Sequence, residues 1–276
     1  MIGAYAFATS DWKELNYPLD LWLKWNSKFF DKIALVKYGN FELNVPENVI
    51  VSEIDEVSRK DFNFYIRGKT EAQHLLDTDW KLALDIDEFV NGRISTEKLK
   101  RERAYAIKMR NLYGNPLTEI INDMFPSYYF RLSYGNRDFK GDGGDLIHNE
   151  WKLRKNMEKY VRFGLRKVGI SEKPHYMVSK PYECCEVWHT GTLRRQDAMS
   201  QKWREQTERE VNMGVKTNAE RLKILNKPFD YHSFRNLGNR VYLRRLDENE
   251  VPSIIMENRD RFWQTDFSED EYENGN

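Results

Sequence analysis

The sequence predicts an α/β fold with a mixed, mostly parallel sheet flanked by helices. Short apolar segments alternate with helical patterns through roughly the first ninety residues, in the order strand, helix, strand, strand, helix, strand. The apolar run at residues 82–84 does not alternate with polar residues, as expected for a central strand covered on both faces. Three carboxylates, Asp85, Asp87 and Glu88, come directly after this run, where ligands gather in parallel sheets.

Each element of this first part has its own signal. Residues 2–10 are small, apolar and aromatic, which predicts a buried first strand. Residues 17–30 place apolar side chains at helical spacing, and Pro18 suits the first turn of a helix. We expect further strands over residues 31–39, 48–54 and 80–86, and a second helix over residues 68–77.

The pattern changes in the second half of the chain. Residues 103–114, 127–136 and 183–191 are predicted to form strands, and residues 195–214 a helix. The acidic, apolar-poor end at residues 266–276 predicts a loose tail. We expect one domain over residues 1–205, followed at 206–276 by a C-terminal helical extension with this acidic tail.

The composition excludes several classes of function. The 276 residues include 44 Lys+Arg and 44 Asp+Glu, so the formal net charge is zero. This balance argues against a protein that binds nucleic acid through a broad basic face. The cysteines, Cys184 and Cys185, are adjacent and predict no disulfide framework, which favours a reducing compartment. We find no signal-peptide pattern and no integral membrane segment, so a soluble, cytoplasmic protein is expected.

The carboxylates at 85–88 favour a metal site. In extended geometry Asp85 and Asp87 point the same way, and hard cations such as Mg²⁺ and Mn²⁺ take oxygen ligands of this kind. An EF-hand fails, because its required Gly and Glu positions hold Val90 and Thr96. A phosphatase of the haloacid dehalogenase kind is weakened, because Phe89 replaces the Thr or Val of D-x-D-x-[TV]. A solvated turn after a buried strand remains open.

The stretch at residues 66–90, IRGKTEAQHLLDTDWKLALDIDEFV, resembles the nucleotide-sugar glycosyltransferases of the GT-A fold, of the family 2-like kind with a D-x-D-E motif. The resemblance implies that residues 1–205 form a GT-A domain, a Rossmann-like nucleotide-sugar-binding fold. It also implies that Ala6 and Phe7 of the first strand, Lys69 and Asp85 meet the nucleotide. The chain departs from the family after the second strand, where residues 37–39 replace an expected acidic residue.

A second stretch, EVWHTGTLRRQDAMSQK at residues 186–202, resembles a histidine segment followed by a basic helix in bacterial GT-A enzymes. The resemblance implies that His189 joins Asp85 and Asp87 as a ligand of Mn²⁺ or Mg²⁺. It further implies that Arg194 and Lys202, with Arg195 as another candidate, support the charge on the donor diphosphate. The alternatives are that His189 has only a structural role and that the basic side chains lie on a solvated face of a helix. Glu88 is expected to orient Asp85 or a metal-bound water.

The expected activity is transfer of a sugar from a nucleotide diphospho-sugar to a hydroxyl of a glycan, lipid-linked or protein acceptor. An inverting mechanism needs a carboxylate base. The leading candidates are Asp145 and Glu186, and Asp142, Glu150 and Glu183 stay open. A nucleotidyltransferase or phosphohydrolase using the same D-x-D site is the alternative enzyme, and a non-catalytic sugar- or nucleotide-binding protein is the third possibility.

Overall fold

The computed structural model describes residues 1–56, 64–97, 99–101, 104–122, 128–136, 139–140, 145–146, 182–212, 229–232 and 241–272. For Ala104, Asn122, Glu210 and Val241, and for residues 128–130, 139–140, 145–146 and 182–184, it describes the backbone alone.

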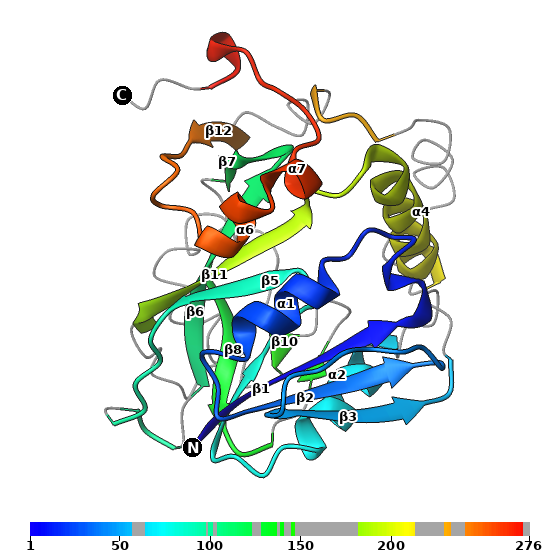
Figure 1. The fold of residues 1–276 in the computed structure, drawn as a ribbon, viewed down its shortest axis with the longest axis vertical. Coiled ribbons are helices and arrows are strands. Elements are labelled where there is room, and N and C mark those ends of the chain that lie inside the picture. The colour runs from blue at the N-terminus through cyan, green and yellow to red at the C-terminus, as the bar shows by residue number, and fades with distance from the viewer. Residues whose placement is uncertain are drawn as a thin grey trace, which may run out of the picture.

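The first part of the chain forms the parallel half of a sheet. Its strands are β1 (Ile2–Thr9), β2 (Lys32–Tyr38), β3 (Val49–Ile54) and β4 (Trp80–Ala83). They lie in the order β3-β2-β1-β4, and all three pairings are parallel. Helices α1 (Leu19–Asn26) and α2 (Phe64–His74) connect them (Figure 1). The predicted order of strands and helices is confirmed.

The sheet continues beyond β4 with antiparallel strands. These are β8 (Tyr128–Tyr134), β6 (Ala104–Tyr113), β7 (Asn115–Asn122) and β12 (Val241–Arg245), each antiparallel to its neighbour. Strand β11 (Tyr182–Thr192) pairs parallel with β6 and antiparallel with β5 (Glu88–Gly92). Strands β9 (Phe139–Lys140) and β10 (Asp145–Leu146) pair separately. The sheet is therefore mixed, as predicted, but its described pairings are not mostly parallel, because parallel pairing is concentrated in its first half.

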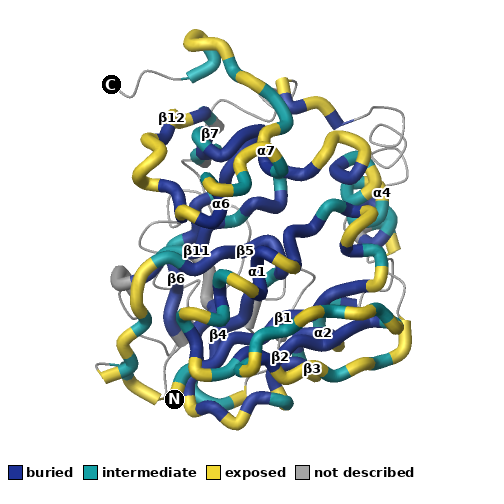
Figure 2. Tube along the Cα trace, viewed as in Figure 1, coloured by how far each residue is buried: buried dark blue, intermediate teal, exposed yellow. Residues whose placement is uncertain are grey.

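Strand β1 is buried on both of its faces (Figure 2). Alternate residues of a strand point to opposite faces, so Ala4, Ala6 and Ala8 pack in the cluster that contains the apolar face of α1. Tyr5 and Phe7 pack on the other side, in the cluster with Phe64 and Ala72 of α2. This double covering explains the non-alternating apolar pattern of the central strands.

The C-terminal part of the chain is built onto the same sheet. Helix α4 (Gln196–Asn212) runs through the expected boundary between residues 205 and 206. Strand β12 pairs with β7, and helices α6 (Ser253–Glu257) and α7 (Arg259–Phe262) bury Ile254, Ile255 and Phe262 in the main core. The extension is thus part helical and part strand, and it shares the core of the first 205 residues.

The acidic end is ordered further than its composition predicts. Phe267 stacks on Tyr113 with ring centroids 5.9 Å apart, and Tyr272 forms a bridge with Leu243 of β12. A short 3-10 helix, η3 (Glu269–Glu271), lies between these two contacts. The prediction of a loose tail is wrong as far as Tyr272, because the Phe267 ring and the backbone bridge of Tyr272 hold the segment against the sheet.

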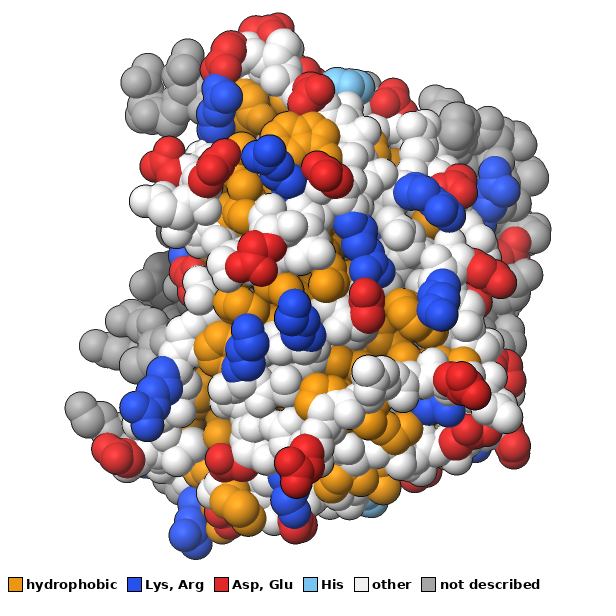
Figure 3. All heavy atoms as spheres, in the orientation of Figure 1, with side chains coloured by type: hydrophobic (Ala, Val, Ile, Leu, Met, Phe, Trp, Pro, Cys, Tyr) orange, Lys and Arg blue, Asp and Glu red, His pale blue; other side chains and the backbone are white. Residues whose placement is uncertain are grey.

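The surface agrees with the neutral composition. On the face drawn in Figure 3, acidic and basic side chains are interspersed, and neither sign dominates. Among the helices of the described residues, none has the length and apolar character needed to cross a membrane.

Candidate functional site

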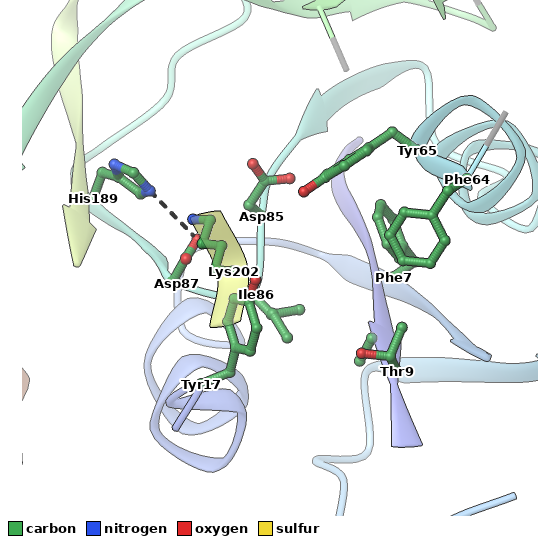
Figure 4. A pocket seen from close by; sticks show the side chains of 11 residues that line it. Phe7, Thr9, Tyr17, Phe64, Tyr65, Asp85, Ile86, Asp87, His189 and Lys202 are labelled. Atoms are coloured by element: carbon green, nitrogen blue, oxygen red, sulfur yellow. Dashed lines mark ion pairs between the residues drawn. The ribbon is translucent and has the colours of Figure 1, made fainter. Parts of the chain in front are cut away.

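A pocket of about 420 Å³, including its open mouth, lies at the carboxyl end of β1 (Figure 4). The turn after β4, the end of β11 and one face of α4 complete its wall. Its lining residues are Phe7, Ala8, Thr9, Tyr17, Phe64, Tyr65, Asp85, Ile86, Asp87, His189 and Lys202. The three residues expected to hold a metal therefore line one pocket.

Asp85 and Asp87 lie in a turn and not on a strand. Strand β4 ends at Ala83, and the last hydrogen bond to β1 runs from the Leu84 N–H to the Tyr5 carbonyl at 3.0 Å. The Glu88 N–H then donates to the Asp85 carbonyl at 3.1 Å, which closes the turn. The predicted strand over residues 80–86 was too long, so the two carboxylates reach the pocket through turn geometry.

The turn is fixed in place by β11. The Thr190 N–H and hydroxyl both donate to the Asp87 carbonyl, at 2.8 and 2.9 Å. The Asp87 side chain is buried and faces His189, with Oδ1 3.7 Å from the imidazole Nε2. Two residues separated by a hundred positions are thereby held opposite one another.

His189 is presented to the pocket as a neutral ring. Its Nδ1 lies 3.0 Å from Asn111 Oδ1, so the neutral ring donates from Nδ1 to the amide oxygen. Burial lowers the pKa of His189 to about 4, against the opposing effect of Asp87. With the proton on Nδ1, the Nε2 lone pair faces the Asp87 carboxylate. Two electron-pair donors facing each other at 3.7 Å are arranged to share a cation.

Gly191 makes this arrangement possible. A Cβ at this position would lie 2.2 Å from His189 Nε2 and 2.9 Å from Asp87 Oδ2. Any larger residue would therefore push the two donors out of place. The glycine forms a cradle directly beneath the side chains expected to bind metal.

Asp85 is held by a buried lysine. Lys69 of α2 is completely buried, and its Nζ lies 2.8 Å from Asp85 Oδ1. Burial acts to raise the pKa of Asp85, but Lys69 and then Arg131 outweigh it and hold the pKa below its ordinary value. Lys69, expected to meet the nucleotide, does not line the pocket and reaches it only through Asp85.

Glu88 is also paired within the core. It forms an ion pair with Arg131 of β8, and its Oε2 accepts a hydrogen bond from the Asp85 N–H at 2.7 Å. Burial raises the pKa of Glu88, while Arg131 acts in the opposite direction. Glu88 therefore orients the backbone of Asp85, and it lies beneath the pocket instead of lining it.

The other predicted nucleotide contacts divide into two groups. Phe7 and Lys202 line the pocket. Ala6 points into the core beside α1, on the opposite face of β1 from Phe7. Arg194 is buried behind Asp87, with Nη2 3.5 Å from Oδ2, and stacks over the Tyr17 ring at 4.0 Å. Arg195 is exposed and pairs with Asp197.

Glu186, a candidate base, is not brought to the pocket. It lies three residues before His189 on β11, and this odd spacing directs the two side chains to opposite faces. Its carboxylate instead pairs with Lys108 at 2.7 Å and Arg110 at 3.7 Å. We therefore withdraw Glu186 as the base.

The remaining base candidates lie wholly or partly outside the described residues. Asp145 belongs to β10, of which the backbone alone is described, and the same holds for Glu183 in β11. Asp142 and Glu150 lie outside the described ranges.

The sequence reasoning missed the aromatic walls of the pocket. Tyr65 extends from α2 toward Asp85, and Tyr17 lies on the other side of the turn (Figure 4). A buried arginine stacks over each ring. The Cζ of Arg209 lies 4.7 Å from the centroid of the Tyr65 ring, and that of Arg194 lies 4.0 Å from the centroid of the Tyr17 ring. The aromatic run directly before Gly68 was a signal for Tyr65, whereas nothing near Tyr17 pointed to a pocket.

The side chains of the pocket can supply part of the coordination shell of a divalent cation, and the remaining ligands would come from phosphate or water. No group of three His, Cys, Asp or Glu side chains is preassembled as a metal site within the described part of the chain. Asp87 and His189 offer two donors over the Gly191 cradle, and Asp85 is turned to Lys69. One carboxylate oxygen and one imidazole nitrogen suit a divalent cation completed by phosphate oxygens or water, and the nitrogen ligand favours Mn²⁺ over Mg²⁺, which takes oxygen ligands.

Comparisons with known proteins add no family to this description. No protein-family model matches the chain, and a search of curated proteins found no significant relative.

Proposed function

We propose that this protein is a metal-dependent glycosyltransferase of the GT-A fold that moves a sugar from a nucleotide diphospho-sugar to a hydroxyl acceptor. The observation that carries the proposal is the apposition of Asp87 and neutral His189, 3.7 Å apart, in a pocket at the carboxyl end of the parallel half of the sheet. Ligands of open α/β sheets bind at this end of the strands.

The order of elements also supports the proposal. Helix α2, with Gly68 and Lys69, precedes β4, the D-x-D turn follows β4, and the histidine comes at the end of β11. The end of β1 supplies Phe7, Ala8 and Thr9 to the same pocket. The sequence resemblance to GT-A enzymes implies this sequence of parts around the donor nucleotide.

Each side chain has a task in such a reaction. A divalent cation at Asp87 and His189 would neutralise the charge that grows on the diphosphate as the glycosidic bond breaks. Asn111 orients His189, and Thr190 fixes Asp87. Lys202 of α4 lines the pocket and can bind phosphate oxygens. The rings of Tyr17 and Tyr65 offer flat apolar surfaces that can pack against a base or a sugar.

Calorimetric titration tests the proposal directly. UDP, GDP, CMP and ATP would each be titrated with and without Mn²⁺ into the wild type, Asp87→Ala and Asp260→Ala. Asp260 is an exposed carboxylate of α7 and serves as the matched control. We expect Mn²⁺-dependent binding of one nucleoside diphosphate. Its affinity should be at least tenfold lower in Asp87→Ala and unchanged in Asp260→Ala.

Other outcomes have clear meanings. Absence of binding for every nucleotide would contradict the proposal. If the bound nucleotide is a triphosphate that is converted with release of pyrophosphate or inorganic phosphate, the same carboxylates serve a nucleotidyltransferase or phosphohydrolase. Release of a nucleoside diphosphate from a sugar donor supports the transferase.

A further inference from the structure

Every carboxylate in the turn after β4 already has a buried cation of its own. The pairs are Lys69 with Asp85, Arg194 with Asp87, and Arg131 with Glu88. The three cationic side chains are each at most 5% exposed. A buried cation this close to a carboxylate lowers the negative potential that would attract a second cation.

The Lys69–Asp85 pair is the most direct of the three. A fully buried ammonium group lies 2.8 Å from a carboxylate that keeps 28% of its side-chain surface exposed in the pocket. Low polarizability around Lys69 strengthens this attraction relative to water. A bare divalent cation approaching Asp85 therefore meets a carboxylate whose charge is largely balanced.

Arg194 acts on Asp87 in a different way. Its Nη2 lies 3.5 Å from Asp87 Oδ2, and neither Nη atom makes a hydrogen bond to a described residue. The Nε donates to the Gly191 carbonyl at 2.9 Å, and the guanidinium stacks over Tyr17. Arg194 is thus anchored by other contacts and lies beside Asp87 as a fixed charge.

The charges of the pocket consequently sum to above zero. Asp85 and Asp87 are matched by Lys69 and Arg194, and Glu88, whose pKa is raised by burial, adds at most one negative charge against Arg131. His189 is neutral through its Nδ1–H bond to Asn111, and Lys202 adds a positive charge on the lining. Such a site gains little from a free divalent cation. A diphosphate carries about three negative charges near neutral pH, so its complex with a divalent cation is still anionic.

We propose that the pocket takes up its divalent cation together with a diphosphate, as one anionic complex, and binds the free cation poorly. The inference rests on the proposed metal site and names the form in which the metal enters it. Lys69 and Arg194 are then the residues that set this preference, because they neutralise Asp85 and Asp87 in advance. Asp87 and His189 supply protein ligands only when the diphosphate supplies the others.

Equilibrium dialysis with Mn²⁺, in the presence and absence of inorganic pyrophosphate, tests this inference without any assumption about base or sugar. We expect wild-type protein to retain Mn²⁺ at least tenfold more tightly when pyrophosphate is present. Arg194→Gln removes a buried charge and should strengthen binding of Mn²⁺ alone several-fold. Arg194→Lys keeps the charge and should behave as the wild type, and Arg259→Gln, at an exposed position on α7, is the control.

The outcomes separate this inference from the proposed function. Tight binding of Mn²⁺ alone that pyrophosphate does not strengthen would overturn the inference and leave the metal site standing. No retention of Mn²⁺ under either condition would overturn both. Lys69→Met provides a second loss of charge, and thermal melts verify that each variant is folded. If neither charge-loss variant folds, the wild-type comparison alone decides.

Discussion

Asn111 and His189 are opposite one another on the paired strands β6 and β11, and the amide oxygen of Asn111 lies 3.0 Å from His189 Nδ1. The parallel register of the two strands fixes this contact. It determines which imidazole nitrogen carries the proton and therefore which one faces Asp87. The orientation of the expected metal ligand thus depends on a residue that does not line the pocket.

Replacing Asn111 by Ala should weaken Mn²⁺-dependent nucleotide binding by about tenfold, because the ring loses the partner that fixes its tautomer and orientation. Asn111→Asp keeps an acceptor at Nδ1 and should retain most of the affinity. Asn91→Ala, on the neighbouring β5, is the control. Calorimetry on the three variants tests this prediction, and equal affinity in wild type and Asn111→Ala would contradict it.

The parallel half of the fold could be predicted because its signal is local. Apolar runs such as residues 82–84 and helical spacing such as residues 17–30 each report on a single element. The partners of those elements are not local. Arg131 meets Glu88 across 43 positions, through the antiparallel strand β8, and no pattern around either residue indicates the pair.

Part of the site could also be predicted, because its signals are local in the sequence. The D-x-D and W-H-T-G stretches are short motifs, and the structure brings Asp85, Asp87 and His189 to one pocket. Glu186 does not reach this pocket, and strand alternation already directs its side chain away from that of His189. Lys69 and Arg194 were predicted to contact the nucleotide, but the structure places them beside Asp85 and Asp87. Their burial behind these carboxylates cannot be recognised before the packing is known.

Gly191→Ala should abolish the metal site while leaving the fold intact. The added methyl would lie 2.2 Å from His189 Nε2, so the ring must move away from Asp87. We expect at least a tenfold loss of Mn²⁺-dependent nucleotide binding. Gly135→Ala is the matched control: its methyl meets open space, but φ is +64°, so it should cost about 1 kcal/mol of stability without affecting binding. Calorimetry with thermal melts distinguishes the two effects.

The metal-free protein should lose stability on acidification through His189. Burial lowers its folded pKa to about 4, below the ordinary value of about 6.5, so the unfolded chain binds the proton more readily between these values. This contribution is present above pH 6.5 and is lost as the pH falls toward 4. Between pH 7 and 5 the free energy of unfolding should fall by about 1 kcal/mol more in wild type than in His189→Gln, since the ring is partly exposed. Denaturant titrations in EDTA measure this difference, and parallel pH profiles would refute it.

The ordered C-terminal segment predicts that Phe267 contributes to stability. Its ring stacks on Tyr113 and covers Gly114, where a Cβ would lie 2.7 Å from the Phe267 ring. Phe267→Ala should lower the free energy of unfolding by about 1–2 kcal/mol. Trp263→Ala, a more exposed aromatic residue of the same segment, should cost less. Denaturant titrations of both variants check the order, and an unchanged midpoint for Phe267→Ala would mean that the tail is loose.

Arg131 and Glu88 should be strongly coupled, because both side chains are at most 5% exposed. Arg131→Met leaves a buried carboxylate without its counter-charge and should cost about 3–5 kcal/mol. Glu88→Gln retains an oxygen that can accept from the Asp85 N–H, so its cost comes mainly from the loss of the ion pair with Arg131. The double variant removes both charges of the pair. Its loss in free energy of unfolding should be smaller than the sum of the two single losses by about 1–3 kcal/mol. A double-mutant cycle by urea unfolding measures this coupling, and additive single effects would show that the pair does not form in solution.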